Sequence, residues 1–324
     1  MDRDFRKRAA KIEERLNALG RSRTPTLFIL SYDLSESYIC PLDQVEEGIR
    51  YHVDGPLRSE GAVSLPYCFD AVTFGQYRRA FDRVIEEIRR GNTYLLNLTF
   101  PSRIRIDADL ETLYEHSDAR FKLLFKDRFV CFSPERFVRI DQGRIHTHPM
   151  KGTIDASIPG AEEKILSDAK ETAEHVMVVD LLRNDLSMVA EKVRVERFRY
   201  VERIRAGERE LLQVSSHITG EVGEEWQNRL GTILTRMLPA GSITGAPKRK
   251  TVEIIREVEG YDRGFFTGVF GVFEGESLDS AVMIRFIEKR GEALVYKSGG
   301  GLTLDSKVRE EYREMKEKVY VPFL

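Results

Sequence analysis

The order of its periodic segments constrains the fold of this 324-residue chain more than any other feature. Apolar residues recur at helical spacing over 74–90, 161–189 and 248–259, whereas residues alternate as in strands over 193–201 and 211–222. Helices and strands therefore come in runs, without strict β-α-β alternation. This order favours one large mixed α/β domain in which largely antiparallel sheets carry helices on their outer faces.

Composition and charge exclude several classes of protein. Hydrophobic residues make up 41% of the chain and charged residues 32%, which is typical of a globular protein. The 51 basic and 53 acidic residues leave a net charge of −2, so neither nucleic acid nor an anionic membrane is an expected partner. No apolar run approaches the ~20 residues that a membrane-spanning helix needs.

The cysteines and the N-terminus favour a cytoplasmic location. Cys40, Cys68 and Cys131 are odd in number, far apart and without C-x-x-C spacing, which suits a reducing compartment and excludes a zinc ribbon. The charged helix predicted over residues 4–19 has no apolar segment of the kind found in a signal peptide.

A lysine between a proline and a glycine is the first candidate for chemistry. Lys151 follows a segment over 137–145 that alternates like a strand. Pro149 fixes its own φ and favours an extended residue before it, whereas Gly152 permits backbone angles that other residues avoid. This pattern predicts that Lys151 lies on a constrained turn and points into a cleft. A solvated loop lysine is the alternative, and this stretch alone does not exclude it.

Glu135 is the carboxylate that could accompany this lysine. It follows the apolar strand predicted over 129–133, and an alternating strand separates it from Lys151. A hairpin-like return could bring both side chains into one cleft, with one as proton donor and the other as nucleophile or base. A surface salt bridge is the alternative.

Two helices carry acidic faces. Glu174 and Asp185 are eleven residues apart, about three turns, and so share a face of the helix predicted over 161–189. On the last helix Glu311, Glu314 and Lys318 share a face. The two acidic faces could meet over a hard divalent cation, since oxygen ligands suit Mg²⁺. A solvated row of charges is the alternative for the last helix.

The helix predicted over 161–189 also has an apolar side and a polar group within it. The pattern predicts inward positions for its apolar residues and a buried polar network near its end. The inward set is Val176, Val179, Leu182 and Leu186, and the network is Asp180, Arg183, Asn184 and Asp185.

Two glycine-rich stretches complete the candidate site. Residues 239–248, PAGSITGAPK, run into a helix and could present backbone N–H groups to a carboxylate or phosphate, although the Walker spacing is missing. Residues 298–301 form a second such turn, and Arg285 could bind a carboxylate through its guanidinium. Together these features indicate a small dianionic substrate, a divalent metal and a reactive lysine.

These motifs together resemble the chorismate-utilising enzymes, which include anthranilate, aminodeoxychorismate, isochorismate and salicylate synthases. The motifs occur in family order over about residues 70–319: SPERF, PMKGT, AEHVMVVDLLRNDL, PAGSITGAPK, GVFGV, IRF, GGGLTLDS and EEYREMKEK. The resemblance implies an α+β fold with two large, mostly antiparallel sheets packed face to face and helices outside. It further implies a single catalytic domain over 1–324, with a shortened N-terminal part over 1–70 and a motif-bearing core over 70–319.

Within the family, the P-x-K-G-T form around Lys151 resembles aminodeoxychorismate synthase component I. The resemblance implies that the lysine amine adds at C2 of chorismate as the C4 hydroxyl leaves, and that ammonia then displaces the lysine to give 4-amino-4-deoxychorismate for 4-aminobenzoate and folate synthesis. Glu135 matches the general acid/base. A separate glutamine amidotransferase subunit would supply the ammonia, because no cysteine lies in a nucleophile elbow.

The resemblance also assigns the rest of the site. Glu174 and Glu314 match Mg²⁺ ligands, and Glu311 lies close to the metal. A metal ion and a cation-rich site would depress the pKa of Lys151. The matched substrate-binding positions are Gly152, Thr153, Thr244, Arg285, Gly300, Gly301 and Lys318.

Three positions depart from the family pattern and leave alternatives open. Leu95 stands where water-adding members carry a lysine and many amine-transferring members a glutamine, Gln213 replaces a frequent histidine, and Phe266 replaces a frequent tyrosine. The alternatives are anthranilate synthase component I, another chorismate enzyme, or a non-catalytic subunit that binds chorismate or scaffolds an amidotransferase.

Overall fold

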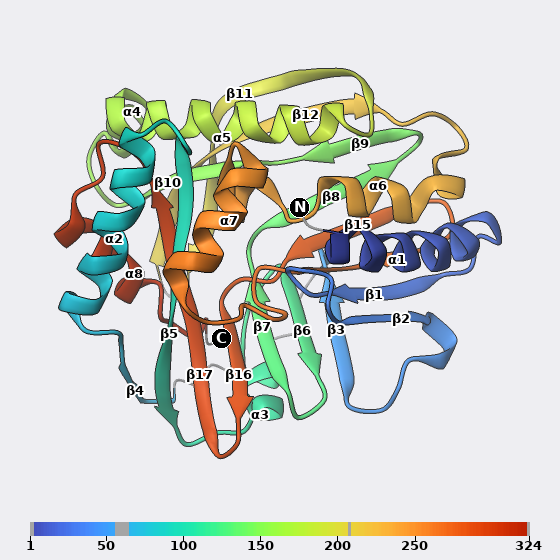
Figure 1. Ribbon diagram of the computed structural model, residues 1–324, viewed down its shortest axis with the longest axis horizontal. Coiled ribbons are helices and arrows are strands. Elements are labelled where there is room, and N and C mark those ends of the chain that lie inside the picture. The colour runs from blue at the N-terminus through green and yellow to red at the C-terminus, as the bar shows by residue number, and fades with distance from the viewer. Residues whose placement is uncertain (1–2, 56–64, 207–208, 323–324) are drawn as a thin grey trace.

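Two antiparallel sheets with helices on their outer sides make up the computed structural model, which describes residues 3–55, 65–206 and 209–322 (Figure 1). The helices are α1 Arg3–Arg21, α2 Phe74–Arg89, α3 Leu110–Glu115, α4 Ala161–Ser167, α5 Ala169–Ser187, α6 Leu230–Met237, α7 Lys248–Glu259 and α8 Val308–Glu317, and the 3₁₀ turns are η1 Leu42–Gln44, η2 Trp226–Arg229 and η3 Gly241–Ile243. The predicted fold class is therefore confirmed. The ends of the predicted 1–324 domain and residues 56–64 of its N-terminal part lie outside the described residues.

Within the described residues the first sheet has nine strands and the second has eight. The first runs β10-β12-β9-β8-β15-β14-β1-β2, with β11 beside β12, and the second runs β13-β5-β17-β16-β7-β6-β3, with β4 beside β5. The first sheet contains β1 Thr26–Leu30, β2 Ser37–Pro41, β8 Arg136–Asp141, β9 Arg144–Thr147, β10 Met150–Asp155, β11 Glu191–Ala206, β12 Arg209–Glu221, β14 Val269–Phe273 and β15 Leu278–Val282. The second contains β3 Ile49–Val53, β4 Tyr67–Asp70, β5 Leu95–Ile106, β6 Phe121–Phe125, β7 Phe129–Ser133, β13 Gly245–Ala246, β16 Phe286–Arg290 and β17 Ala293–Leu302.

The sheets pack because central strands such as β1 are apolar on both faces. Successive side chains of a strand point to opposite faces. In β1, Leu27 and Ile29 join a core shared with β6, β7 and β16 of the second sheet. Phe28 and Leu30 join a different core, shared with α1, α5 and α6. One five-residue strand thus holds the two sheets together and binds the outer helices.

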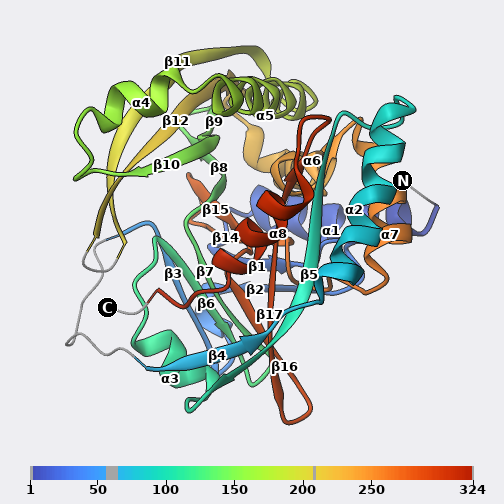
Figure 2. The same cartoon turned by 90° about the vertical axis from the view of Figure 1, so that its left-hand side faces the viewer.

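The helices form two groups over the outer faces (Figure 2). α4 and α5 lie over β10, β11 and β12, and α1 and α6 lie side by side over the same sheet. α2, α7 and α8 lie along β5 and β17 of the second sheet. No helix in the described part of the chain is long and apolar enough to cross a membrane.

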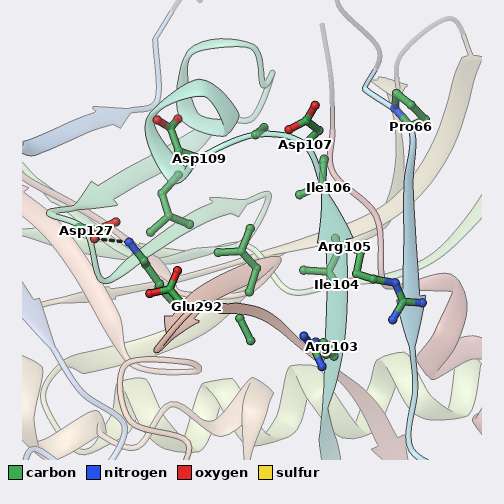
Figure 3. A pocket seen from close by; sticks show the side chains of 14 residues that line it. Pro66, Arg103, Ile104, Arg105, Ile106, Asp107, Asp109, Asp127 and Glu292 are labelled. Atoms are coloured by element: carbon green, nitrogen blue, oxygen red, sulfur yellow. Dashed lines mark hydrogen bonds and ion pairs between the residues drawn. The ribbon is translucent and has the colours of Figure 1, made fainter.

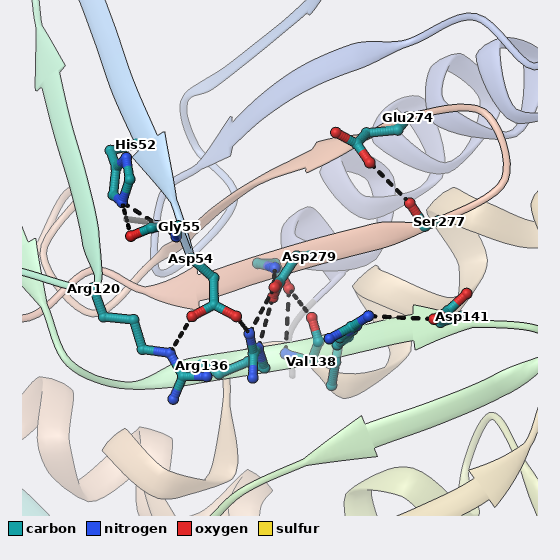
Figure 4. A network of polar contacts seen from close by, with 12 residues as sticks. His52, Asp54, Gly55, Arg120, Arg136, Val138, Asp141, Glu274, Ser277 and Asp279 are labelled. Carbon is teal, nitrogen blue, oxygen red and sulfur yellow. Dashed lines mark hydrogen bonds and ion pairs between the residues drawn. The ribbon is translucent and has the colours of Figure 1, made fainter. Parts of the chain in front are cut away.

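A buried guanidinium connects the two sheets between β3 and β8 (Figure 4). The Arg136 side chain, which is 4% exposed, donates to both Asp279 oxygens at 2.8 and 2.7 Å and pairs with Asp54 just after β3. Asp54 also accepts from Arg120 Nε at 2.6 Å. The guanidinium neighbours lower the pKa of Asp54 although burial opposes them. This network fixes the edge of the second sheet against the first.

The helical region after Asp155 differs from the prediction in three ways. It is divided at Asp168, whose side chain caps α5 by accepting from the Glu171 N–H at 2.9 Å. Val176 is 46% exposed, so its predicted inward position is wrong, whereas the other three predicted apolar positions are buried. The predicted buried network is also wrong, because of its members only Asp185 is buried.

The stretch around Lys151 is part of a strand and not a turn. β10 pairs with β12, but the register shifts within the pair. The three residue positions from Met150 to Thr153 on β10 lie opposite only two positions, from Ser215 to Gln213, on β12. Gly152 has φ +85°, a conformation that glycine adopts without strain. The proline and glycine pattern therefore marks a β-bulge, which re-aims the side chains next to it.

Candidate active site

Lys151 on β10 meets Glu174 on α5. Its Nζ lies 2.5 Å from Glu174 Oε2, and both side chains are largely buried. The bulge at Gly152 and the packing of α5 against β10 produce this contact between segments that the sequence separates.

The acidic faces of α5 and α8 come together as the spacing predicted. Lys170 Nζ lies 3.9 Å from Glu174 Oε1 and 3.8 Å from Glu311 Oε1, so one ammonium group spans both helices. Glu171, which the sequence analysis did not single out, joins this cluster, because a Cβ on Gly152 would lie 3.1 Å from its Oε2. Its i, i+3 spacing from Glu174 was the available signal. We call Lys151, Lys170, Glu171, Glu174, Glu311 and Glu314 the carboxylate cluster.

The cluster contains more negative than positive charge. Burial raises the pKa of Glu171 and of Glu311, and neighbouring carboxylates raise both further. Buried Glu171 Oε2 has no hydrogen-bond partner among the described residues. The site therefore has unused acceptor capacity for a cation.

The excess charge decides the protonation state of Lys151. Burial alone lowers the pKa of its ammonium, but the charge and hydrogen bond of Glu174, with Glu314 and Glu171, outweigh burial and raise it. The cation-rich surroundings expected from the sequence are wrong, because carboxylates surround the amine, whereas the expected effect of a bound metal on the pKa of Lys151 stays a prediction.

The atoms of the cluster that could bind a metal are of the type that Mg²⁺ prefers. All are carboxylate oxygens, as a hard divalent cation prefers. Within the described ranges, however, no three acidic, histidine or cysteine side chains converge as a ready metal site. The ammonium groups of Lys151 and Lys170 stand among these carboxylates. The residues fit the metal by chemistry, and a bound ion would take over the charge balance that these lysines provide.

Glu135 belongs to a second group of charges, next to the carboxylate cluster. Its carboxylate accepts a hydrogen bond from the Ser242 hydroxyl and faces Arg285 and Lys318. Burial raises the pKa of Glu135, and these three neighbours only partly oppose that effect. A carboxyl group with a raised pKa can hold and donate a proton near neutral pH.

Lys318 lies between the two groups. Its Nζ is 2.7 Å from Glu314 Oε1 and donates to the Gly299 carbonyl at 3.1 Å, and its charge also acts on Glu135. Burial lowers the pKa of Lys318 more than Glu314 raises it. Among the described residues Glu135 and Lys151 form no hydrogen bond or ion pair with each other, and Lys318 interacts electrostatically with both.

The other predicted anchoring residues divide into two sets. Gly300 adjoins the site, because a Cβ there would lie 3.5 Å from Lys318 Nζ and 3.6 Å from Glu314 Oε1. Arg285 faces Glu135, and its Nε has no hydrogen-bond partner in the described chain. In contrast, Thr153 is exposed, and the Thr244 hydroxyl donates to the Ala240 carbonyl at 2.7 Å.

Of the three divergent positions, Leu95 and Phe266 are buried and Gln213 is half-buried. Buried Leu95 lies beside Gly301, whose added Cβ would be 3.1 Å from Leu95 Cδ1. Gln213 pairs across the sheet with Thr153. Phe266 is buried against Phe286, with ring centroids 5.9 Å apart.

A pocket of about 600 Å³ lies elsewhere, at the far ends of β5 and of the β16–β17 hairpin (Figure 3). Its charged rim includes Arg103, Arg105 and an ion pair between Lys289 and Asp127. No predicted site residue lines this pocket.

Comparison with known proteins identifies the family. Residues 25–323 match the family model described as chorismate binding enzyme. The chain is 48% identical over 315 residues to a Pasteurella multocida protein named "Uncharacterized PabA-like protein", covering 95% of this chain and 97% of the relative. It is 29% identical to anthranilate synthase component 1 of Aeropyrum pernix, covering 92% of this chain and 76% of the relative.

A solved structure shows the same fold. The menaquinone-specific isochorismate synthase of Escherichia coli superposes with a TM-score of 0.71 at 14% identity, covering 96% of this chain and 80% of the other. The extent of the family match places the chain in the chorismate binding enzyme family.

Proposed function

We propose that this protein is aminodeoxychorismate synthase component I, which converts chorismate and ammonia into 4-amino-4-deoxychorismate. The observation that carries the proposal is the position of Lys151, held inside a chorismate-family site with its Nζ 2.5 Å from Glu174. An enclosed amine can act as a nucleophile on a bound substrate, a role that does not suit a solvated lysine.

In the first step, the neutral Lys151 amine forms a bond to C2 of chorismate. The two ring double bonds shift, the C4–O bond breaks, and Glu135 gives its proton to the departing oxygen, which leaves as water. The raised pKa of Glu135 supports this role, because burial favours its protonated form.

In the second step, ammonia forms a bond to C4. The double bonds shift back, the C2–N bond breaks, and Lys151 leaves as an amine. The Glu135 carboxylate accepts the proton that the incoming nitrogen loses, so the sum is chorismate plus ammonia giving 4-amino-4-deoxychorismate plus water. The acid is thereby restored for the next cycle.

The first step requires an uncharged Lys151. In the metal-free protein the carboxylates hold the amine protonated. Mg²⁺ bound by Glu174 and Glu314, with Glu311 close by, would offset that charge and hold the ring carboxylate of the substrate. Once Glu174 is neutralised, burial favours the neutral amine of Lys151.

Cationic groups next to Glu135 would hold the second carboxylate of chorismate. Arg285 has an unused Nε, and Lys318 lies beside Gly300. Gly152, Gly301, Thr153 and Thr244 are proposed as further contacts from the family resemblance, and the last two would have to exchange their present surroundings for substrate.

Ammonia would come from a separate glutamine amidotransferase subunit. Of the three cysteines, Cys131 is buried within β7, and burial raises its pKa. Such a thiol is a poor nucleophile. The proposed setting is cytoplasmic synthesis of 4-aminobenzoate and folate, in keeping with three unpaired cysteines.

Anthranilate synthase component I is the second candidate. The relative from Aeropyrum pernix, 29% identical over 92% of this chain, carries that name. The two activities share chorismate and ammonia and differ in the ring carbon that receives nitrogen.

Product identification separates these functions. The protein is incubated with chorismate, Mg²⁺ and ammonium, and products are separated with and without an added aminodeoxychorismate lyase. We expect 4-aminobenzoate only when the lyase is present. Direct anthranilate would support the second candidate, and chorismate binding without turnover would support a non-catalytic subunit.

A further inference from the structure

Two backbone N–H groups of the loop over residues 239–246 are bonded within the protein. Gly241 N–H donates to Asp185 Oδ2 at 3.0 Å, and Thr244 N–H donates to the Gly241 carbonyl at 3.1 Å. These two N–H groups are therefore not available to the anion that the composition predicted at this loop. Contacts on both of its sides hold this loop in a fixed position.

A buried ion pair holds one side of this loop. Lys248 Nζ lies 2.7 Å from Asp185 Oδ1 and donates to the Met237 carbonyl at 2.7 Å. A Cβ at Gly241 would lie 2.7 Å from Asp185 Oδ2 and 2.9 Å from Leu181 Cγ, so only glycine allows this approach. Two of the family motifs, AEHVMVVDLLRNDL and PAGSITGAPK, thus meet in one contact.

A second buried ion pair holds the other side. Arg263 donates to the Ile243 carbonyl at 2.9 Å and pairs with Glu259 at 2.6 Å. Both side chains are 1% exposed. Ionic contacts on both sides therefore immobilise the 3₁₀ turn η3 between them.

The side chain that this turn presents to the active site is Ser242. Its hydroxyl donates to Oε1 of Glu135, while the Glu135 N–H donates to Ser133 Oγ at 3.1 Å. A hydroxyl bound to one carboxyl oxygen leaves the other oxygen to carry the proton. The direction in which Glu135 delivers its proton then depends on the position of Ser242.

We infer that Ser242 is a positioning residue for the proton donor Glu135, and that the Asp185–Lys248 pair acts on the reaction by fixing Ser242. This inference rests on the proposed function, because it takes Glu135 as the acid that assists departure of the C4 hydroxyl. It gives a role to the buried pair of Asp185 and Lys248, which lies behind the turn that carries Ser242.

The first test compares Ser242→Ala with Ser242→Thr in the full chain. We expect Ser242→Ala to lower kcat with chorismate and ammonium by about 10- to 100-fold, less than the loss of a general acid itself, with KM nearly unchanged. Ser242→Thr keeps the hydroxyl and should restore most of the rate.

The pH profile separates positioning from general damage. Loss of the Ser242 hydrogen bond removes an interaction that lowers the pKa of Glu135, while Arg285 and Lys318 remain. The alkaline limb of kcat should therefore move to higher pH in Ser242→Ala. A kcat within twofold of wild type and an unmoved limb would overturn the inference.

A double-mutant cycle tests the role of Asp185. If Asp185 acts through Ser242, Asp185→Asn should add little to the rate loss already caused by Ser242→Ala. Multiplicative effects would refute that part, and Arg183→Gln, at an exposed position of α5, is the matched control. If Asp185→Asn does not fold, Lys248→Gln takes its place in the same cycle. Wild-type protein that makes no 4-amino-4-deoxychorismate would instead refute the proposed function.

Discussion

Helix α5 carries two carboxylates about three turns apart, and each meets a lysine in a different setting. Glu174 lies 2.5 Å from Lys151 at the candidate site, and Asp185 lies 2.7 Å from Lys248 in the interior. The pairs are nearly equal in length and come from one helix face. The pKa values of the two lysines nevertheless shift in opposite directions.

At the interior pair burial dominates. It lowers the pKa of Lys248 and raises that of Asp185, because each charge has only one opposite partner to offset its desolvation. At Lys151 the pKa is raised despite burial, because Glu174, Glu314 and Glu171 all act on one ammonium. The number of surrounding opposite charges, and not the contact distance, decides the outcome.

The network around Asp54 is balanced, with Arg120 and Arg136 against Asp54 and Asp279. Two guanidinium groups, from Arg120 and Arg136, act on one carboxylate and lower its pKa. These two structural groups are therefore balanced in charge, whereas the candidate site is carboxylate-rich. That imbalance is a physical reason to expect a cation at the site.

The largest expected effect is that of Lys151→Ala. Loss of the nucleophile should lower the rate of ammonium-dependent product formation on the order of 10³-fold or more. The assay follows 4-aminobenzoate through a coupled lyase. Lys170→Ala removes a neighbouring ammonium without removing the nucleophile and should cost much less. Equal losses in both variants would place Lys151 among residues that only balance charge.

Besides its expected effect on the rate, breaking the interior pair should lower stability. Lys248→Met leaves Asp185 buried without its cation, which should lower the free energy of unfolding by about 3 kcal/mol. Urea unfolding measures the loss. Lys192→Met breaks an exposed 2.7 Å pair with Glu221 and should leave stability nearly unchanged. Similar losses in the two variants would contradict the contrast between interior and surface pairs.

Neutralising Glu174 should lower the pKa of Lys151, so that it shifts in the same direction as the pKa of Lys248. With Glu174→Gln, burial is opposed by fewer charges, so the pKa of Lys151 should fall. The pH at which Lys151 is half acylated by a limiting amine reagent, measured by peptide mass spectrometry without metal, reports this change. Glu163→Gln, at an exposed position of α4, is the control. An unchanged or higher midpoint in Glu174→Gln would show that the carboxylate does not hold the ammonium.

The smallest effect is expected at Asp54. Its folded-state pKa is lowered, so its stabilising effect is present above its unfolded pKa and is lost as pH falls through the folded pKa. Asp54→Asn, which tolerates the φ of +41°, should cost about 1 kcal/mol at pH 7 and progressively less on acidification. Unfolding free energies at pH 7 and pH 3 measure this. A loss that is independent of pH would assign the effect to packing.

The fold was predictable wherever the spacing of apolar residues within one segment identified it as a helix or a strand. The α7 helix over Lys248–Glu259 has the predicted ends, and α2 differs by one residue. The break at Asp168 was missed because apolar spacing continues across it, whereas a side-chain cap decides the boundary. The strand β10 was missed because Pro149 just before it and Gly152 within it indicate a turn. Only the pairing of β10 with β12 shows that this stretch is a β-bulge.

The candidate site was predictable as a set of residue types and not as a set of contacts. The approach of the acidic faces of α5 and α8 followed from helical spacing. The raised pKa of Lys151 did not, because it depends on Glu171, Glu174 and Glu314 meeting across β10, α5 and α8. Ser242 was hidden within a glycine-rich loop, and its contact with Glu135 spans 107 positions of the chain.

A single measurement tests the central claim that Lys151 is the covalent nucleophile. Protein, chorismate and Mg²⁺ are mixed without ammonia and quenched within one turnover, and peptides are mapped by mass. The account predicts that the peptide containing Lys151 gains the mass of chorismate less water, and that added ammonium removes this adduct as 4-amino-4-deoxychorismate appears. Formation of that product at the full rate while Lys151 stays unmodified, or with the adduct on another residue, would contradict it.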